Sequence, residues 1–122
     1  MEKVQNTKRY DLEERTLDFA KRILHLAKSL PKNQINFKLI DQFVRSGASV
    51  GANYREANET ETKKDFQFRI RICRKEAKET YYWLLLIVES NPEFKKRVES
   101  LLQESQELVK IFAAIIERSR SH

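Results

Sequence analysis

The chain has 122 residues, of which 34% are charged and 40% are apolar, and its formal net charge at pH 7 is +6. This length suits a single domain, residues 1–122, and the periodic recurrence of the apolar residues excludes a disordered chain. The longest apolar run, residues 83–88, is too short to span a bilayer, and the first nine residues have no apolar signal region. We therefore expect a cytoplasmic protein that has no membrane partner.

The first two helices are expected at about residues 12–30 and 37–58. Asp11 is followed three residues later by a glutamate, which is the spacing of a capping box. Apolar residues then recur at three-to-four spacing: Leu12, Phe19, Ile23, Leu26, Ala27 and Leu30. Pro31 interrupts this helix, and Asn36 is predicted to cap the second one.

The third and fourth helices are expected at about residues 63–89 and 93–119. Thr62 is suited to cap the third helix, whose core stripe is Phe66, Ile70, Cys73, Ala77, Leu84 and Ile87. Asn91 and Pro92 then restart the chain, because asparagine caps helices and proline is tolerated at the first helical position. Four long helices with short connections, and no strand-like alternation, predict an all-α fold, an antiparallel up-down-up-down four-helix bundle.

Gly47 and Gly51, the only two glycines, lie one turn apart in the second expected helix. Each costs roughly 1 kcal/mol relative to alanine, so we predict that another helix passes close to this face. Three short polar residues line one flank of the same helix: Ser46, Ser49 and Asn53. They are expected either to bond to third-helix partners such as Glu76 or Glu79, or to lie exposed on the surface.

A second side of the third helix lies about 120° from its core stripe. We call it the second seam, and it consists of Phe68, Ile72, Glu76, Glu79, Trp83 and Leu86. Its two carboxylates are expected to pair with arginine or hydroxyl groups across an interface. A large apolar patch rimmed by charge marks an interaction site, so we predict that the seam joins copies of the chain. The alternative is a broad stripe that is buried within one bundle.

The third side of this helix carries six cations within about 120° of one another. We call it the basic stripe, and it consists of Lys63, Lys64, Arg71, Arg74, Lys75 and Lys78. Such a row of cations is suited to contact successive phosphates of RNA or DNA, with strong salt dependence and little sequence specificity. The alternative is a solvated face that keeps the protein soluble.

The sequence shows no apparatus for catalysis. Neither His25 nor His122 belongs to a set with metal-ligand spacing, so no metal site and no cofactor are expected. Cys73, the only cysteine, falls within the core stripe, where a small buried apolar residue is the simplest interpretation. Glu76 and Glu79 share a helix face, but they lack a neighbouring histidine or metal ligand, which favours interhelical hydrogen bonding over acid and base work. We expect a protein that is not an enzyme.

Two segments in order carry a resemblance to a known family. Residues 45–53 (RSGASVGAN) precede a glutamate and Ala57, and residues 75–84 (KEAKETYYWL) follow in the third helix. Together they resemble the four-helix-bundle family of proteins encoded in intervening sequences of 23S ribosomal RNA genes, over about residues 11–117. The chain departs at one point, because many members have a glycine soon after that glutamate and this chain has Ala57 followed by Asn58.

The resemblance implies an antiparallel bundle that assembles into a ring-like homopentamer. The family's ribosomal label reflects gene location and is no evidence of a ribosomal role. The family is also similar to the accessory protein of diversity-generating retroelements, a basic pentamer that works with a reverse transcriptase and nucleic acid. The positions that match the family's motifs are implied to be structural or interfacial: Arg45, Ser46, Ser49, Asn53, Glu76, Glu79 and Trp83. Two functions stay open, which are nucleic-acid binding through the basic stripe and recruitment of a partner protein by a scaffold.

Overall fold

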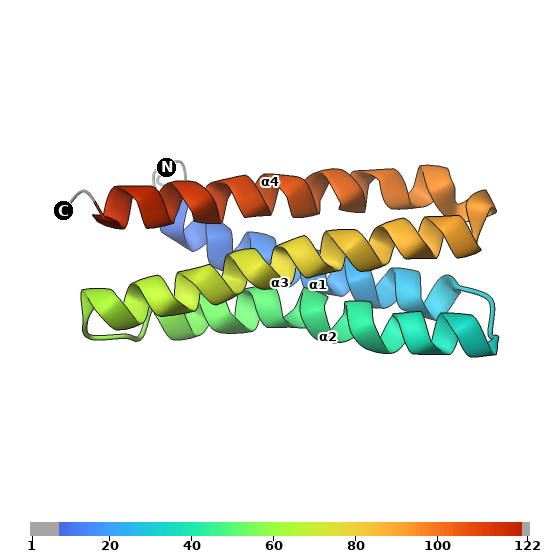
Figure 1. Ribbon diagram of the computed structural model, residues 1–122, viewed down its shortest axis with the longest axis horizontal. Helices are drawn as coiled ribbons and strands as arrows, with labels where there is room; N and C mark the ends of the chain where they lie inside the picture. The colour runs from blue at the N-terminus through green and yellow to red at the C-terminus, as the bar shows by residue number, and fades with distance from the viewer. Residues whose placement is uncertain (1–7, 121–122) are drawn as a thin grey trace.

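The computed structural model describes residues 8–120 as four helices that lie side by side (Figure 1). They are α1 (Lys8–Ser29), α2 (Gln34–Ala57), α3 (Lys63–Ser90) and α4 (Lys95–Arg120), with a short 3-10 helix, η2 (Pro92–Phe94), before α4. The prediction of an all-α fold is confirmed, since residues 8–120 contain no strand. Within the same range no helix combines the length and the apolarity that crossing a membrane requires.

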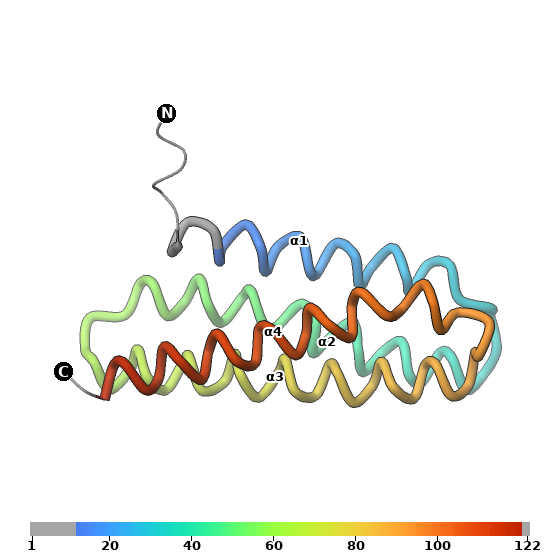
Figure 2. The backbone as a smooth tube through the Cα atoms, turned by 90° about the horizontal axis from the view of Figure 1, so that it is seen from above, coloured from blue at the N-terminus to red at the C-terminus, as the bar shows by residue number. Residues whose placement is uncertain are grey.

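The path of the chain keeps sequence neighbours together. In Figure 1 the chain turns back at each of its three connections, so that α2 returns along α1, α3 along α2 and α4 along α3. Seen from above in Figure 2, α1 begins and α4 ends at the same end of the molecule. The first and last helices are thereby neighbours as well, and side-chain hydrogen bonds join them.

The start of α2 differs from the prediction. Asn33, not Asn36, is the N-cap, and its side chain accepts a hydrogen bond of 2.9 Å from the Asn36 backbone N–H. Asn36 lies inside the first turn, fully buried, and exchanges two amide hydrogen bonds of 3.0 and 2.9 Å with Asn91. The Asn91 side chain is used in that pair and in a bond to the Ile87 carbonyl, and it makes no N-cap hydrogen bond. The 3-10 helix η2 then precedes α4.

Of the other predicted helix starts, that of α3 is confirmed and that of α1 is wrong. Thr62 caps α3 as predicted, because its hydroxyl accepts a hydrogen bond of 3.1 Å from the Asp65 backbone N–H. The prediction for α1 is wrong at its first turn, since the helix begins at Lys8 and Asp11 lies inside it. A good capping residue therefore marks a helix start only when the chain before it leaves the helical path.

The core is built from the faces that the apolar spacing predicted. Three phenylalanines from three different helices are fully buried, namely Phe19, Phe43 and Phe112. Cys73 is fully buried among them on α3, and this burial raises the pKa of its thiol to about 12. The thiol stays protonated at neutral pH, which confirms that Cys73 is a packing residue and removes the thiolate that a nucleophile requires.

The two glycines allow α2 to approach α1. A Cβ at Gly47 would lie 3.0 Å from the Ile23 Cγ1, and a Cβ at Gly51 would lie 2.9 Å from the Thr16 Oγ1. Separations this short are repulsive for non-bonded atoms. The predicted close approach is confirmed, and the neighbour is the first helix.

Candidate nucleic-acid interface

The basic stripe lies on the solvent side of α3. Five of its residues are exposed and Arg74 is half-buried. Among the described side chains, the stripe forms a single ion pair, from the Lys75 Nζ to the Glu76 Oε2 at 3.8 Å. Most of its charge is therefore free to attract an anionic partner.

Two cations of the stripe stand where they do not help the helix. Lys63 and Lys64 occupy the first turn of α3, where Asp65 is the acidic residue. The N-terminus of a helix carries partial positive charge, so each lysine there is unfavourable by about 0.3–1 kcal/mol at low salt. Helix stability thus gives no reason for these two charges.

The structure adds an aromatic residue that the sequence analysis missed. Tyr82 follows Lys75 and Lys78 at a spacing of seven and four residues, so it lies on the same side of α3. Its side chain is 55% exposed, and its ring meets Trp83 edge-on with centroids 5.2 Å apart. A row of cations that ends in an exposed ring is typical of surfaces that bind single-stranded nucleic acid, since the ring stacks on a base. The spacing of Tyr82 from Lys75 and Lys78 could have identified this residue from the sequence.

The second seam is divided between the bundle and the solvent. Glu76 is buried, Phe68 is 58% exposed, and the other four residues are half-buried. The Arg45 guanidinium of α2 pairs with Glu76 at 3.4 Å and with Glu79 at 3.3 Å. Both carboxylates thus have an arginine partner within the same chain, and Trp83 packs against the core. The alternative interpretation, a broad stripe buried within one bundle, describes Glu76 and Trp83. Phe68 is exposed and is available for contact with another molecule.

The polar flank of α2 bonds to α3 as predicted, but through residues other than Glu76 and Glu79. The Ser46 Oγ accepts a hydrogen bond of 2.8 Å from the Thr80 hydroxyl, and the Asn53 Oδ1 accepts one of 2.8 Å from the Arg69 guanidinium. Ser49 donates to a backbone carbonyl one turn earlier in its own helix. The prediction of third-helix partners is confirmed for Ser46 and Asn53. The named glutamates are not those partners, because the longer Arg45 of α2 reaches both carboxylates and binds them with opposite charge.

Within residues 8–120 no three side chains of histidine, cysteine, aspartate or glutamate are placed to hold a metal ion. His25 is exposed on α1, and His122 lies outside the described residues.

Comparisons with known proteins agree with the helical architecture. The family described as "23S rRNA-intervening sequence protein" matches residues 8–114. The chain is also similar to the crystal structure of a Bacteroides thetaiotaomicron protein of unknown function from the S23 ribosomal protein family, with 37% identity and a TM-score of 0.83. That match covers 91% of this chain and 99% of the other. No curated protein matches the sequence. On these grounds, the chain belongs to the family of 23S rRNA-intervening sequence proteins.

Proposed function

We propose that this protein is a non-enzymatic, cytoplasmic nucleic-acid-binding protein that contacts RNA or DNA through the basic stripe of α3. The observation that carries the proposal is a row of six cations that forms a single ion pair with the side chains that the structure describes. We further propose that the chain acts as an antiparallel up-down-up-down bundle, assembled through the second seam into a ring-like homo-oligomer. The family resemblance makes a homopentamer the expected size.

Binding of this kind has a calculable dependence on salt. If all six cations replace counterions on a single strand, the slope of log K against log salt is about −4, which is six times roughly −0.7. A contact limited to half of the stripe would halve that slope. The slope therefore measures how much of the stripe meets phosphate.

The test reverses three charges in the middle of the stripe: Arg71→Glu, Arg74→Glu and Lys78→Glu. Fluorescence anisotropy with labelled RNA and DNA, at several salt concentrations, is expected to show loss of binding in this triple variant. A matched control reverses three exposed lysines elsewhere, Lys21, Lys28 and Lys32, and makes the same change in net charge. Binding that survives in the stripe variant, or wild-type binding that is insensitive to salt, rejects the proposal.

The exposed ring of Tyr82 gives a second and independent test. Stacking on one base contributes about 1–3 kcal/mol, so Tyr82→Ala should weaken binding of a single strand by about 5- to 150-fold. Binding of a duplex, whose bases are already stacked, should change little. Phe37→Ala, at a similarly exposed ring on α2, is the control. An equal loss for single strand and duplex would show that the ring does not stack on a base.

Assembly through the seam is supported by two of its residues. Phe68 presents an apolar ring to solvent, and the Trp83 Nε1 is buried without a hydrogen-bond acceptor among the described residues. An unpaired buried donor costs about 1–3 kcal/mol, and a small rotation of the indole toward an acceptor on a second copy would remove that cost. The variant Trp83→Lys with Ile72→Glu should give a folded, smaller species by light scattering. An unaltered mass would assign the seam to the core.

A scaffold that recruits a partner protein, such as a reverse transcriptase, is the competing function. It predicts no appreciable nucleic-acid affinity at physiological salt and a specific protein that co-purifies with the chain. The anisotropy titration separates the two functions, because only the nucleic-acid function predicts that the wild type binds the labelled RNA or DNA. Recruitment of a partner protein should survive charge reversal of the stripe, unless that partner is acidic.

A further inference from the structure

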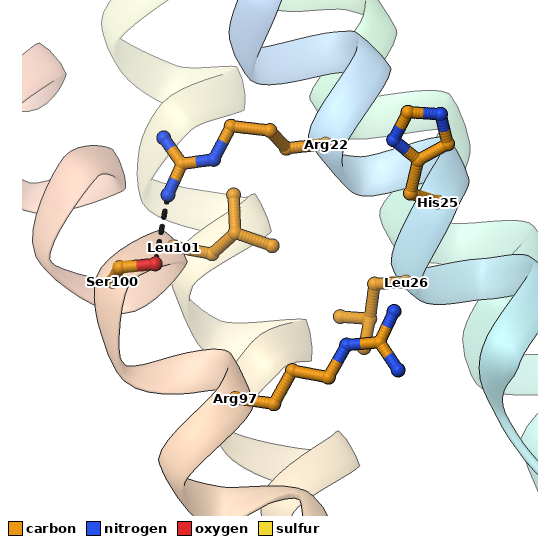
Figure 3. Close-up of a pocket in the computed structure, with 6 residues that line it drawn as sticks. All are labelled: Arg22, His25, Leu26, Arg97, Ser100 and Leu101. Atoms are coloured by element: carbon orange, nitrogen blue, oxygen red, sulfur yellow. Dashed lines mark hydrogen bonds between the residues drawn. The ribbon is translucent and has the colours of Figure 1, made fainter.

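A small basic pocket lies between α1 and α4, away from the residues used above (Figure 3). Its volume is about 180 Å³, and its lining residues are Arg22, His25, Leu26, Arg97, Ser100 and Leu101. Figure 3 shows Arg22 reaching from α1 toward α4, whereas Arg97 reaches from α4 toward α1. Leu26 and Leu101 are buried and form the inner wall. No carboxylate belongs to the lining.

Both guanidinium groups are bonded to neutral hydroxyls. The Arg22 Nη2 donates to the Ser100 Oγ at 2.8 Å, and the Arg97 Nη2 donates to the Ser29 Oγ at 2.7 Å. Among the described side chains, neither arginine has an ion-pair partner. The Arg97 guanidinium also lies over the Phe94 ring, 5.7 Å from its centroid. Two permanent positive charges therefore share one small pocket without a carboxylate partner among the described side chains.

Arg15, also on α1, shows how an arginine between α1 and α4 is neutralised by carboxylates. Arg15 binds Glu104 with its Nε at 2.7 Å and its Nη2 at 3.0 Å, and it also binds Glu107 at 2.8 Å. These contacts raise the pKa of the guanidinium, chiefly through the hydrogen bond to Glu104. Since Arg15 occupies both carboxylates, neither is left to neutralise the pocket, whose α4 residues lie earlier in that helix.

We propose that this pocket binds a phosphate-type oxyanion, either free or as a phosphate monoester. The planar fork of a guanidinium matches the oxygen atoms of phosphate, and two forks on opposite walls supply donors from both helices. The Ser100 hydroxyl accepts from Arg22 and keeps its own proton to donate to an anion. The pocket holds several times the roughly 30 Å³ of one water molecule, which is room for a tetrahedral anion. The site is independent of the basic stripe, so it stands even if the protein binds no nucleic acid.

The test follows the arginine side chains directly. The Nε–Hε signals of uniformly ¹⁵N-labelled protein are recorded during titration with sodium phosphate, with methyl phosphate and with sodium chloride at matched ionic strength. We expect saturable shifts of the Arg22 and Arg97 signals with phosphate and none with chloride. The variant Arg22→Gln with Arg97→Gln should weaken phosphate binding by about tenfold or more, since each lost guanidinium removes charge-assisted hydrogen bonds.

The matched control is Arg71→Gln with Arg74→Gln, which removes the same charge from the basic stripe and should leave the phosphate affinity within about twofold. Saturable shifts with both anions show that the site also accepts a phosphate monoester, and shifts with inorganic phosphate alone assign a site for the free anion. The proposal is overturned if the wild-type signals do not shift saturably. It is also overturned if a folded double variant binds phosphate as tightly as the wild type.

Discussion

The close approach of α1 and α2 can be tested by placing a side chain at Gly51. A methyl group there would lie 2.9 Å from the Thr16 Oγ1 and 3.1 Å from the Thr16 Cβ. Thr16 cannot easily turn aside, because it is fully buried and its hydroxyl donates to the Leu12 carbonyl at 2.7 Å. Its β-branched side chain is also stiff at χ1. The two helices must therefore move apart, or the hydrogen bond must break.

The size of the effect follows from two opposing contributions. Alanine is the better helix former by about 1 kcal/mol, whereas overpacking a tight contact costs about 1–3 kcal/mol. Gly51→Ala should therefore lower the free energy of unfolding by between about 0 and 2 kcal/mol. Gly51→Leu adds three more carbons at the same contact and should lower it by about 1–3 kcal/mol.

Urea unfolding followed by circular dichroism measures these changes. Ala52 is the next residue of α2 and is exposed, so Ala52→Leu is the matched control and should change stability by less than about 0.5 kcal/mol. Adding Thr16→Ala should reduce the cost of Gly51→Ala by about 0.5 kcal/mol or more, because the hydroxyl that clashes is removed. A melting temperature for Gly51→Leu equal to that of the wild type would refute the close approach.

Two further predictions concern buried polar groups. Burial raises the pKa of Cys73 from an ordinary 9.0 to about 12, so its contribution to stability is fully present below pH 9 and is lost as the pH rises toward 12. The free energy of unfolding should fall with pH in this window by up to about 1.4 kcal/mol per unit more for the wild type than for Cys73→Ala; parallel curves would contradict this. Asn36→Ala leaves the buried Asn91 amide without its partner and should cost about 1–3 kcal/mol. Thermal unfolding of the double variant with Asn91→Ala should show less than the sum of the two single losses, and strict additivity would contradict a shared hydrogen-bonded pair.

The helix boundaries show where local sequence information ends. The apolar spacing predicts the four helices. The start of α3 is also predictable, because Thr62 is a good capping residue that directly precedes a regular apolar stripe. The second helix offers two asparagines that are suited to cap it, Asn33 and Asn36. The choice depends on Asn91, which is 55 residues away and binds Asn36 in the interior. Sequence spacing carries no information about that contact.

Part of the candidate site is likewise predictable from the sequence, and part depends on contacts between helices. The angle of each residue around α3 is fixed by helical geometry, so the exposed basic stripe is predictable from spacing. The pairing of Arg45 with Glu76 and Glu79 requires the rotation and the axial register of α2 against α3, which follow from packing of the whole bundle. The basic pocket needs Arg22 and Arg97, which lie 75 positions apart and give no local pattern at all.

The geometry of α3 links the two proposed properties of its surface. The seam and the stripe are centred about 120° apart on the helix, so assembly through the seam would leave the stripe exposed and repeat it in every copy. Several stripes on one ring bind a long nucleic acid together, and such multivalency raises affinity by about 10²–10⁴. Trp83→Lys with Ile72→Glu leaves the net charge and the stripe unchanged. This variant should therefore lose affinity for long RNA together with its mass, but keep the affinity of one stripe for a short oligonucleotide. Equal losses for long and short RNA would mean that the seam residues contact the nucleic acid themselves.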